Sequence, residues 1–166
     1  MSHTTTSAKP DERYKSTVGY QRNNPGNLMV QGVSYAGKAT KQSKGGPVSF
    51  CTMAWGLRAL AMDLKKKMES INKISAIIEK YAPRSENNTD AYIRYVAAEL
   101  KKSAEEVIAW DDASKLVVMR TIIRMEIGYG TCPFSDDELK TAIESAKVSV
   151  EAGAVCELPT PYAPPR

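Results

Sequence analysis

Asparagine side chains are concentrated in the segment Arg22-Asn-Asn-Pro-Gly-Asn27, around a Pro-Gly turn. An asparagine amide donates and accepts hydrogen bonds from a short side chain, which suits it to the hydroxyl and acetamido groups of N-acetyl sugars. Asparagine also satisfies its own backbone in tight turns, so a purely structural turn is the alternative. We therefore expect Arg22, Asn23, Asn24 and Asn27 either to bind a sugar or to stabilise this turn.

Glu126 lies near the end of the most apolar helical stretch, Leu116 to Ile123, and shortly before Gly128. Burial against apolar side chains raises the pKa of a carboxyl group, so that it holds a proton near neutral pH and can deliver it to a leaving-group oxygen. The alternative is a surface glutamate at a helix C-terminus, where the helix dipole disfavours its charge. The pattern alone supports both interpretations equally.

A second polar cluster, Glu86-Asn-Asn-Thr89, follows Tyr81-Ala-Pro83 and precedes Tyr92. Polar residues of these types are also typical of a helix N-terminus, which is the simpler interpretation. Motifs of other chemistries are missing from the sequence: it contains no Gly-x-Ser-x-Gly, no phosphate-binding Walker loop and no dinucleotide-binding glycine pattern.

The composition limits the function further. With 166 residues, 42% of them hydrophobic, and a net charge of +4, the chain fits one compact domain. This positive charge is small, and the sequence lacks the dense cluster of Lys and Arg that is typical of a nucleic-acid-binding protein. His3 is the only histidine, so neither a zinc site nor a cysteine–histidine catalytic pair is expected. We expect Cys51, Cys132 and Cys156 to be buried free thiols, with a Cys132–Cys156 disulfide as the alternative in an oxidising compartment.

The sequence opens without the basic start and apolar run of a signal peptide. No stretch approaches the roughly 18 apolar residues of a membrane span. We expect a protein that is made in the cytoplasm, so that any work on a cell wall would need delivery by a phage particle, by lysis or by a secretion system.

The hydrophobic pattern predicts a mainly α fold of the α+β type. We expect residues 1–16 to form a flexible N-terminal arm, residues 17–152 to form the folded domain, and residues 153–166 to form a proline-rich C-terminal tail. Residues 18–52 are rich in Gly, Asn, Ser and Thr and have short β-prone pieces at 28–30 and 48–50, which predicts loops with a small sheet or hairpin.

Helical periodicity begins at residue 53. The pattern predicts helices over 53–68, over 71–81 before Pro83, and from 89 to 100. Capping-box patterns at Ser103 and Ser135 predict a short helix reaching Trp110 and a last helix through Val150. Between them, a helix capped by Asp112 and ended by glycines is apolar over most of its surface, and we expect it to be the central one.

These segments together resemble a family of phage and prophage virion proteins that are described as structural or lysozyme-like. The resemblance spans about residues 19–146. The matching pieces are Arg22-Asn-Asn-Pro-Gly-Asn-Leu28, Phe50-x-Thr52, Gly56-Leu-Arg-Ala-Leu60, Ile77-Ile-x-x-Tyr-Ala-Pro83, Glu86-Asn-x-Thr89, Tyr92-Ile-x-x-Val96 and Ile122-Ile-Arg-x-Glu-x-Gly128. Phage relatives tend to have His-Glu-Asn-Gly where this chain has Met125-Glu-Ile-Gly128, which makes the surroundings of the glutamate more apolar or marks a site without activity.

The same pieces resemble soluble lytic transglycosylases in a rotated order, because in those enzymes the glutamate helix comes first. We therefore expect a circularly permuted lysozyme-like fold, a rearrangement that nearby surface termini make easy. The resemblance implies a peptidoglycan-degrading glycosidase, either a lytic transglycosylase or a muramidase, that cleaves the MurNAc–GlcNAc strand with Glu126 as acid and base. It implies no metal or organic cofactor.

The resemblance also implies roles for individual residues. Residues expected to bind the N-acetyl sugars or to line the cleft are Arg22, Asn23, Asn24, Asn27, Tyr81, Asn87, Thr89 and Tyr92. Glycoside hydrolysis commonly uses two carboxylates, and Glu86 is the candidate for the second. With Glu126 as the better-supported carboxylate, the lytic-transglycosylase route is favoured, in which the sugar's own hydroxyl attacks and forms an anhydro product.

Two other functions stay open. One is a non-catalytic virion or baseplate component that keeps a lysozyme-like shape for assembly. The other is a delivered antibacterial toxin with the same chemistry, which a cognate immunity protein neutralises in the producing cell. The expected partners are therefore peptidoglycan glycan strands, together with an immunity protein or with a virion or secretion component.

Overall fold

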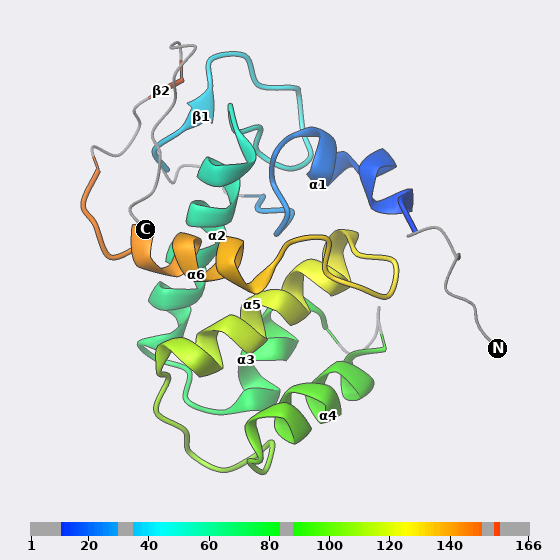
Figure 1. Ribbon diagram of the computed structural model, residues 1–166, viewed down its shortest axis with the longest axis vertical. Helices are drawn as coiled ribbons and strands as arrows, with labels where there is room; N and C mark the ends of the chain where they lie inside the picture. Colours follow the sequence, from blue (N-terminus) through cyan, green and yellow to red (C-terminus); the bar gives the residue numbers. More distant parts are fainter. Residues whose placement is uncertain (1–10, 30–34, 84–87, 151–154, 157–166) are drawn as a thin grey trace, which may run out of the picture.

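The computed structural model describes residues 11–29, 35–83 and 88–150 and the backbone of residues 155–156. These residues form a mainly helical structure, as the hydrophobic pattern predicts (Figure 1). Its elements are a 3-10 turn η1 (Arg13–Ser16) and the helices α1 (Val18–Gln21), α2 (Met53–Met68), α3 (Ile74–Tyr81), α4 (Thr89–Leu100), α5 (Asp112–Ile127) and α6 (Asp136–Ser145). Most of the predicted arm and tail lies outside the described residues.

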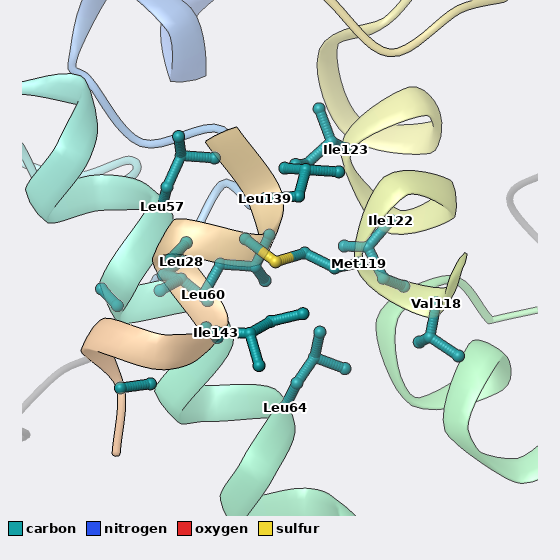
Figure 2. Packing of buried hydrophobic residues seen from close by; sticks show 14 of the residues in the cluster. Leu28, Leu57, Leu60, Leu64, Val118, Met119, Ile122, Ile123, Leu139 and Ile143 are labelled. Carbon is teal, nitrogen blue, oxygen red and sulfur yellow. The ribbon is translucent and has the colours of Figure 1, made fainter. Parts of the chain in front are cut away.

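Helix α5 is the central helix of the structure. It contacts α1, α2, α3, α4 and α6, and its side chains Val118, Met119, Ile122 and Ile123 are fully buried. Figure 2 shows Met119, Ile122 and Ile123 facing leucines of α2 and Leu139 and Ile143 of α6. An all-round apolar helix is expected at the centre of a bundle, so the position of α5 follows from its composition. Within the described residues, no helix is long and apolar enough to cross a membrane.

Helix α6 begins at the predicted capping box. The Ser135 hydroxyl accepts a hydrogen bond from the Glu138 backbone N–H, and the Glu138 carboxylate accepts one from the Ser135 backbone N–H. At Ser103, where a capping box is also predicted, one of its two hydrogen bonds forms: the Ser103 backbone N–H donates to Glu106 Oε1 at 2.7 Å. Residues 103–110 nevertheless form no helix, so that prediction is wrong.

Tertiary hydrogen bonds explain why the chain leaves the helical path after Ser103. The backbone N–H of Ile108 donates to the Asn72 carbonyl at 2.8 Å, and the indole N–H of Trp110 donates to the Ile71 carbonyl at 2.6 Å. The Ala104 carbonyl accepts from the Ser75 N–H, at the first turn of α3. The Ile108 N–H and the Ala104 carbonyl are groups that a helix would need for its own ladder, and the Trp110 indole adds a further bond that holds the segment near the start of α3.

The two serines give a matched test of capping. We expect Ser135→Ala to lower the free energy of unfolding by about 1 kcal/mol, because it removes a hydrogen-bond acceptor for the free N–H groups of α6. Ser103→Ala makes the same substitution in the same sequence pattern, but no helix follows Ser103. We therefore expect it to lower the free energy of unfolding by less than about 0.5 kcal/mol. Urea unfolding of both variants checks this, and equal losses would contradict it.

The predicted β region is reduced to very short pieces. Strand β1 (Lys38–Ala39) pairs in parallel with β2 (Val155–Cys156), and Lys38 also forms one antiparallel bridge with Phe50. Among the described residues, two backbone hydrogen bonds join residues 37–39 to 49–51, from the Ala39 N–H to the Ser49 carbonyl and from the Cys51 N–H to the Gly37 carbonyl, and one side chain adds to them. The Gln42 amide donates to the carbonyls of Ala39 and Ser49 and accepts from the Ser49 N–H at 2.8 Å.

The cysteines differ from the expectation of three free thiols. Cys51 forms a disulfide bond, whereas Cys132 is a free thiol. The expected free thiol is therefore wrong for Cys51, and the alternative Cys132–Cys156 pairing is wrong because Cys132 is unbonded. Spacing along the chain carried no signal for this, since a disulfide depends on which Cβ atoms meet in the fold.

Candidate active site

The asparagine-rich turn follows α1 and lies directly against α2. Asn23 and Asn27 both adopt the left-handed backbone conformation, with φ of 54° and 50°, which asparagine tolerates better than most residues. Gly56 allows this close packing, because a Cβ atom there would lie 1.7 Å from the Asn23 carbonyl oxygen. The turn is thus held in place by the first turns of α2.

Three of the four predicted sugar-binding residues in this turn make structural hydrogen bonds. The Asn24 side chain is fully buried and bonds to the backbone of Leu28 and Val48. The Asn23 amide donates to the Phe50 carbonyl at 3.0 Å. The Arg22 guanidinium donates to the carbonyls of Gly45 at 3.0 Å and Pro47 at 2.8 Å. These side chains connect the turn to residues 45–50, as the structural interpretation of the turn requires.

Asn27 behaves differently and reaches the predicted catalytic residue. Its amide nitrogen donates to the backbone carbonyl of Glu126 at 3.3 Å and to the carboxylate oxygen Oε2 at 3.4 Å. Gly19 makes room for this arrangement, since a Cβ atom there would lie 2.1 Å from Asn27 Oδ1. The structure therefore brings one asparagine of the predicted cluster together with Glu126.

Glu126 lies in the last turn of α5, partly buried. Burial raises the pKa of its carboxyl group above the ordinary value of 4.5, and the hydrogen bond from Asn27 opposes that shift without cancelling it. The desolvation effect is the larger one because the neighbouring positions are apolar, including the fully buried Ile123 and Ile127. The surface interpretation of this glutamate is not what the structure shows.

Glu126 and Asn27 line a cavity of about 720 Å³. A cavity of this size lies within the range of small-molecule sites and is lined by both apolar and polar groups. Its lining consists of Thr17, Val18, Gly19, Gly26, Asn27, Leu28, Met29, Pro47, Asp63, Lys67, Lys80, Tyr81 and Glu126. The walls come from α1, the asparagine-rich turn, α2, α3 and α5, segments that are far apart in the chain.

A second carboxylate, Asp63 of α2, lines the same cavity and was not predicted from the sequence. Its Oδ2 accepts hydrogen bonds from the Tyr81 hydroxyl at 2.6 Å and from the Lys67 ammonium at 2.5 Å. Its Oδ1 accepts from the Tyr35 hydroxyl at 3.2 Å. Burial, and then the negative charge of Asp63, raises the pKa of both tyrosines, so their hydroxyls stay protonated and donate.

The other predicted site residues are distributed as follows. Tyr81 lines the cavity. Thr89 is the first residue of α4, which fits the helix N-terminus interpretation, and its buried hydroxyl donates to the Ala82 carbonyl at 2.8 Å. The Tyr92 ring lies 5.9 Å from the Arg124 guanidinium and is not part of the cavity lining. Glu86 and Asn87 lie outside the described residues.

Among the described residues, no cluster of three or more His, Cys, Asp or Glu side chains has the arrangement of a metal site. Comparison with known proteins gives no further guide: no protein-family model matches the chain, and no curated protein matches it.

Proposed function

We propose that this protein is a glycosidase that cleaves the MurNAc–GlcNAc strands of peptidoglycan with Glu126 as the acid and base. The observation that carries the proposal is the Glu126 carboxyl group itself. It lies in a cavity wall, its pKa is raised by burial, and the asparagine-rich turn contributes a side chain that bonds to it. A carboxyl group that holds its proton near neutral pH is what protonation of a glycosidic oxygen requires.

In the proposed mechanism the strand lies in the cavity with its glycosidic oxygen next to Glu126. The Glu126 carboxyl donates its proton to that oxygen, the bond from the anomeric carbon C1 to the oxygen breaks, and positive charge develops on the sugar ring. The Glu126 carboxylate then takes the proton of the same sugar's 6-hydroxyl, whose oxygen attacks C1. The product is a 1,6-anhydro end, as in a lytic transglycosylase.

The proposal includes a circularly permuted lysozyme-like arrangement. The asparagine-rich turn and α2 come before the helix that carries the glutamate, and all three meet at the cavity. The sugars would contact Asn27 and Tyr81 directly, whereas Arg22, Asn23 and Asn24 would support the turn. This division of roles follows from the hydrogen bonds that each side chain already makes.

The disulfide at Cys51 supports a site of action outside the cytoplasm. Disulfide bonds persist in the periplasm and at cell surfaces, where the peptidoglycan is also found. We infer that the protein acts there after delivery by a phage particle, by lysis or by a secretion system, and that an immunity protein would be needed only in the last case.

Digestion of purified peptidoglycan sacculi by the wild-type protein tests the proposed function. We expect soluble muropeptides whose masses show anhydro-muramic ends. Reducing ends would instead show that water is the attacking group and that the enzyme is a muramidase. If no muropeptides are released by protein whose folding is verified by circular dichroism, the proposal is wrong and a structural role in a virion is favoured.

A further inference from the structure

We propose that Asp63 is the second carboxylate of this site, held by Tyr35, Tyr81 and Lys67 as a fixed anion that stabilises the positive charge developing on the sugar ring. The proposal rests on the proposed function, because it assigns a role in the same cavity. It differs from the expectation for Glu86, since Asp63 belongs to α2 and lines the cavity together with Glu126.

Asp63 is surrounded by hydrogen-bond donors that come from three different parts of the structure. Tyr35 comes from the segment before β1, Lys67 from the next turn of α2, and Tyr81 from the end of α3. An aspartate that served only a surface ion pair with the lysine four residues on would stabilise α2 slightly and would need no tyrosines. Here the carboxylate is held from three directions, and its side chain is only 12% exposed.

The donors around Asp63 also stabilise the negative charge of its carboxylate. A carboxylate that accepts all three hydrogen bonds is acting as an ionised group, which has acceptors only. Lys67 balances that charge and also lies over the Tyr81 ring, 4.4 Å from its centre. Side chains held in this way need no reorganisation when positive charge appears in the cavity, and fixed groups of this kind stabilise transition states effectively.

The two carboxyl groups of the cavity, those of Glu126 and Asp63, have different surroundings. The Glu126 carboxylate accepts a side-chain hydrogen bond from Asn27 and lies in the same helical turn as the fully buried Ile123 and Ile127. Asp63 receives hydrogen bonds from two hydroxyls and an ammonium group. Glycosidases place one protonated and one ionised carboxyl group in the same cleft by such differences in surroundings. Asp63 forms no covalent bond in this proposal, because its role is electrostatic.

Binding of a charged probe tests Asp63 without any turnover. The probe is an iminosugar that carries its acetamido group on C2, so that its ring nitrogen stays basic and cationic, and the reference is the neutral N-acetylglucosamine of the same size, both titrated by calorimetry. We expect the wild-type protein to bind the cation more tightly by about tenfold or more, as one favourable charge interaction in a cavity allows. We expect Asp63→Asn to remove that preference while the neutral sugar binds within about threefold of wild type.

Control variants separate charge from structural support. Asp137→Asn makes the same change at an exposed position of α6 outside the cavity lining, and we expect the preference to be unchanged. Lys67→Met keeps the carboxylate but removes its balancing cation, so the preference for the iminosugar should rise. It also serves as the decisive variant if Asp63→Asn does not fold. A preference that falls in Lys67→Met, or that survives in Asp63→Asn, would overturn the role of Asp63.

The outcomes also distinguish this proposal from the proposed function. A wild-type protein that prefers the cation but degrades no peptidoglycan would contradict the glycosidase function and leave the anionic site in place. A wild-type protein that degrades peptidoglycan but shows no preference would overturn the role of Asp63 alone. If both hold, Asp63→Asn should lower kcat by about a hundredfold with KM nearly unchanged, because the charge acts in the transition state.

Discussion

Replacing Glu126 by glutamine is expected to lower the rate of muropeptide release by about a thousandfold, because an amide has no acidic proton to donate to the leaving oxygen. Glutamine keeps the size of the side chain and can still accept the hydrogen bond from Asn27, so the cavity should keep its shape. The rate is measured by chromatography of soluble fragments released from sacculi. Circular dichroism of the variant verifies that the fold is intact.

The same substitution should change how stability depends on pH. The raised pKa of Glu126 means that the folded protein holds this proton at pH values where the unfolded chain has lost it. The free energy of unfolding therefore falls as the pH rises from the unfolded pKa through the folded one. Glu126→Gln lacks this loss, so it should be more stable than wild type above that window, with a smaller difference below it. Activity of the wild type should fall over the same window, because the acid must be protonated.

Glu69→Gln is the matched control for both measurements. Glu69 is exposed at the end of α2 and does not line the cavity, and its replacement should leave the cleavage rate within about twofold of wild type. Wall degradation by Glu126→Gln at the wild-type rate would mean that the acid is another group. A loss of activity in both variants would point to a general effect of charge on binding to sacculi.

Asn24→Ala is expected to lower the free energy of unfolding by about 3 kcal/mol, the largest stability effect we predict for a polar residue of this protein. Asn24 is fully buried, and its amide donates to the Leu28 carbonyl at 3.1 Å and the Val48 carbonyl at 2.8 Å. Its Oδ1 accepts from the Leu28 N–H at 3.0 Å. Alanine would leave buried backbone groups without partners and would open a small void, and both effects destabilise the folded state. Urea unfolding measures the change.

The functional consequence of Asn24→Ala should exceed its effect on the folded fraction. Asn24 anchors the turn that places Asn27 against Glu126, so a looser turn should reduce kcat even where the variant is almost entirely folded. Asn72→Ala is the control, because Asn72 is exposed and its side chain has no described hydrogen bond; we expect a change below about 0.5 kcal/mol. Equal stability of the two variants would show that Asn24 is not an anchor.

Local signals in the sequence were sufficient for most of the helices. The capping box at Ser135 and the apolar composition of α5 correctly predict where a helix begins and which helix is buried. The capping residue predicted for α5, Asp112, is wrong by one position. The cap is Asp111, whose side chain accepts a hydrogen bond from the Ser114 N–H, and Asp112 is the first residue of the helix. The helix predicted after Ser103 does not form, because hydrogen bonds to residues at the start of α3 outweigh the local preference for a helix.

The candidate site was only partly predictable. Asn24 and Asn27 have the same chemistry and lie three residues apart, and only the three-dimensional path of the turn decides that one is buried as an anchor and the other reaches Glu126. Asp63 was missed because, in the sequence, Asp63 and Lys67 look like an ordinary surface pair. The available signal was an acidic residue within the apolar run from Leu57 to Leu64, but its tyrosine partners come from elsewhere in the chain.

The hydrogen bond between Asn27 and Glu126 links residues that are 99 positions apart. Contacts between such distant residues form late in folding, because a long loop must close first. A nascent chain on the ribosome that has not yet released α5 therefore carries the turn without the acid, and a misfolded chain carries both without the cavity. Any chemistry that needs both side chains therefore requires a chain that has folded through α5.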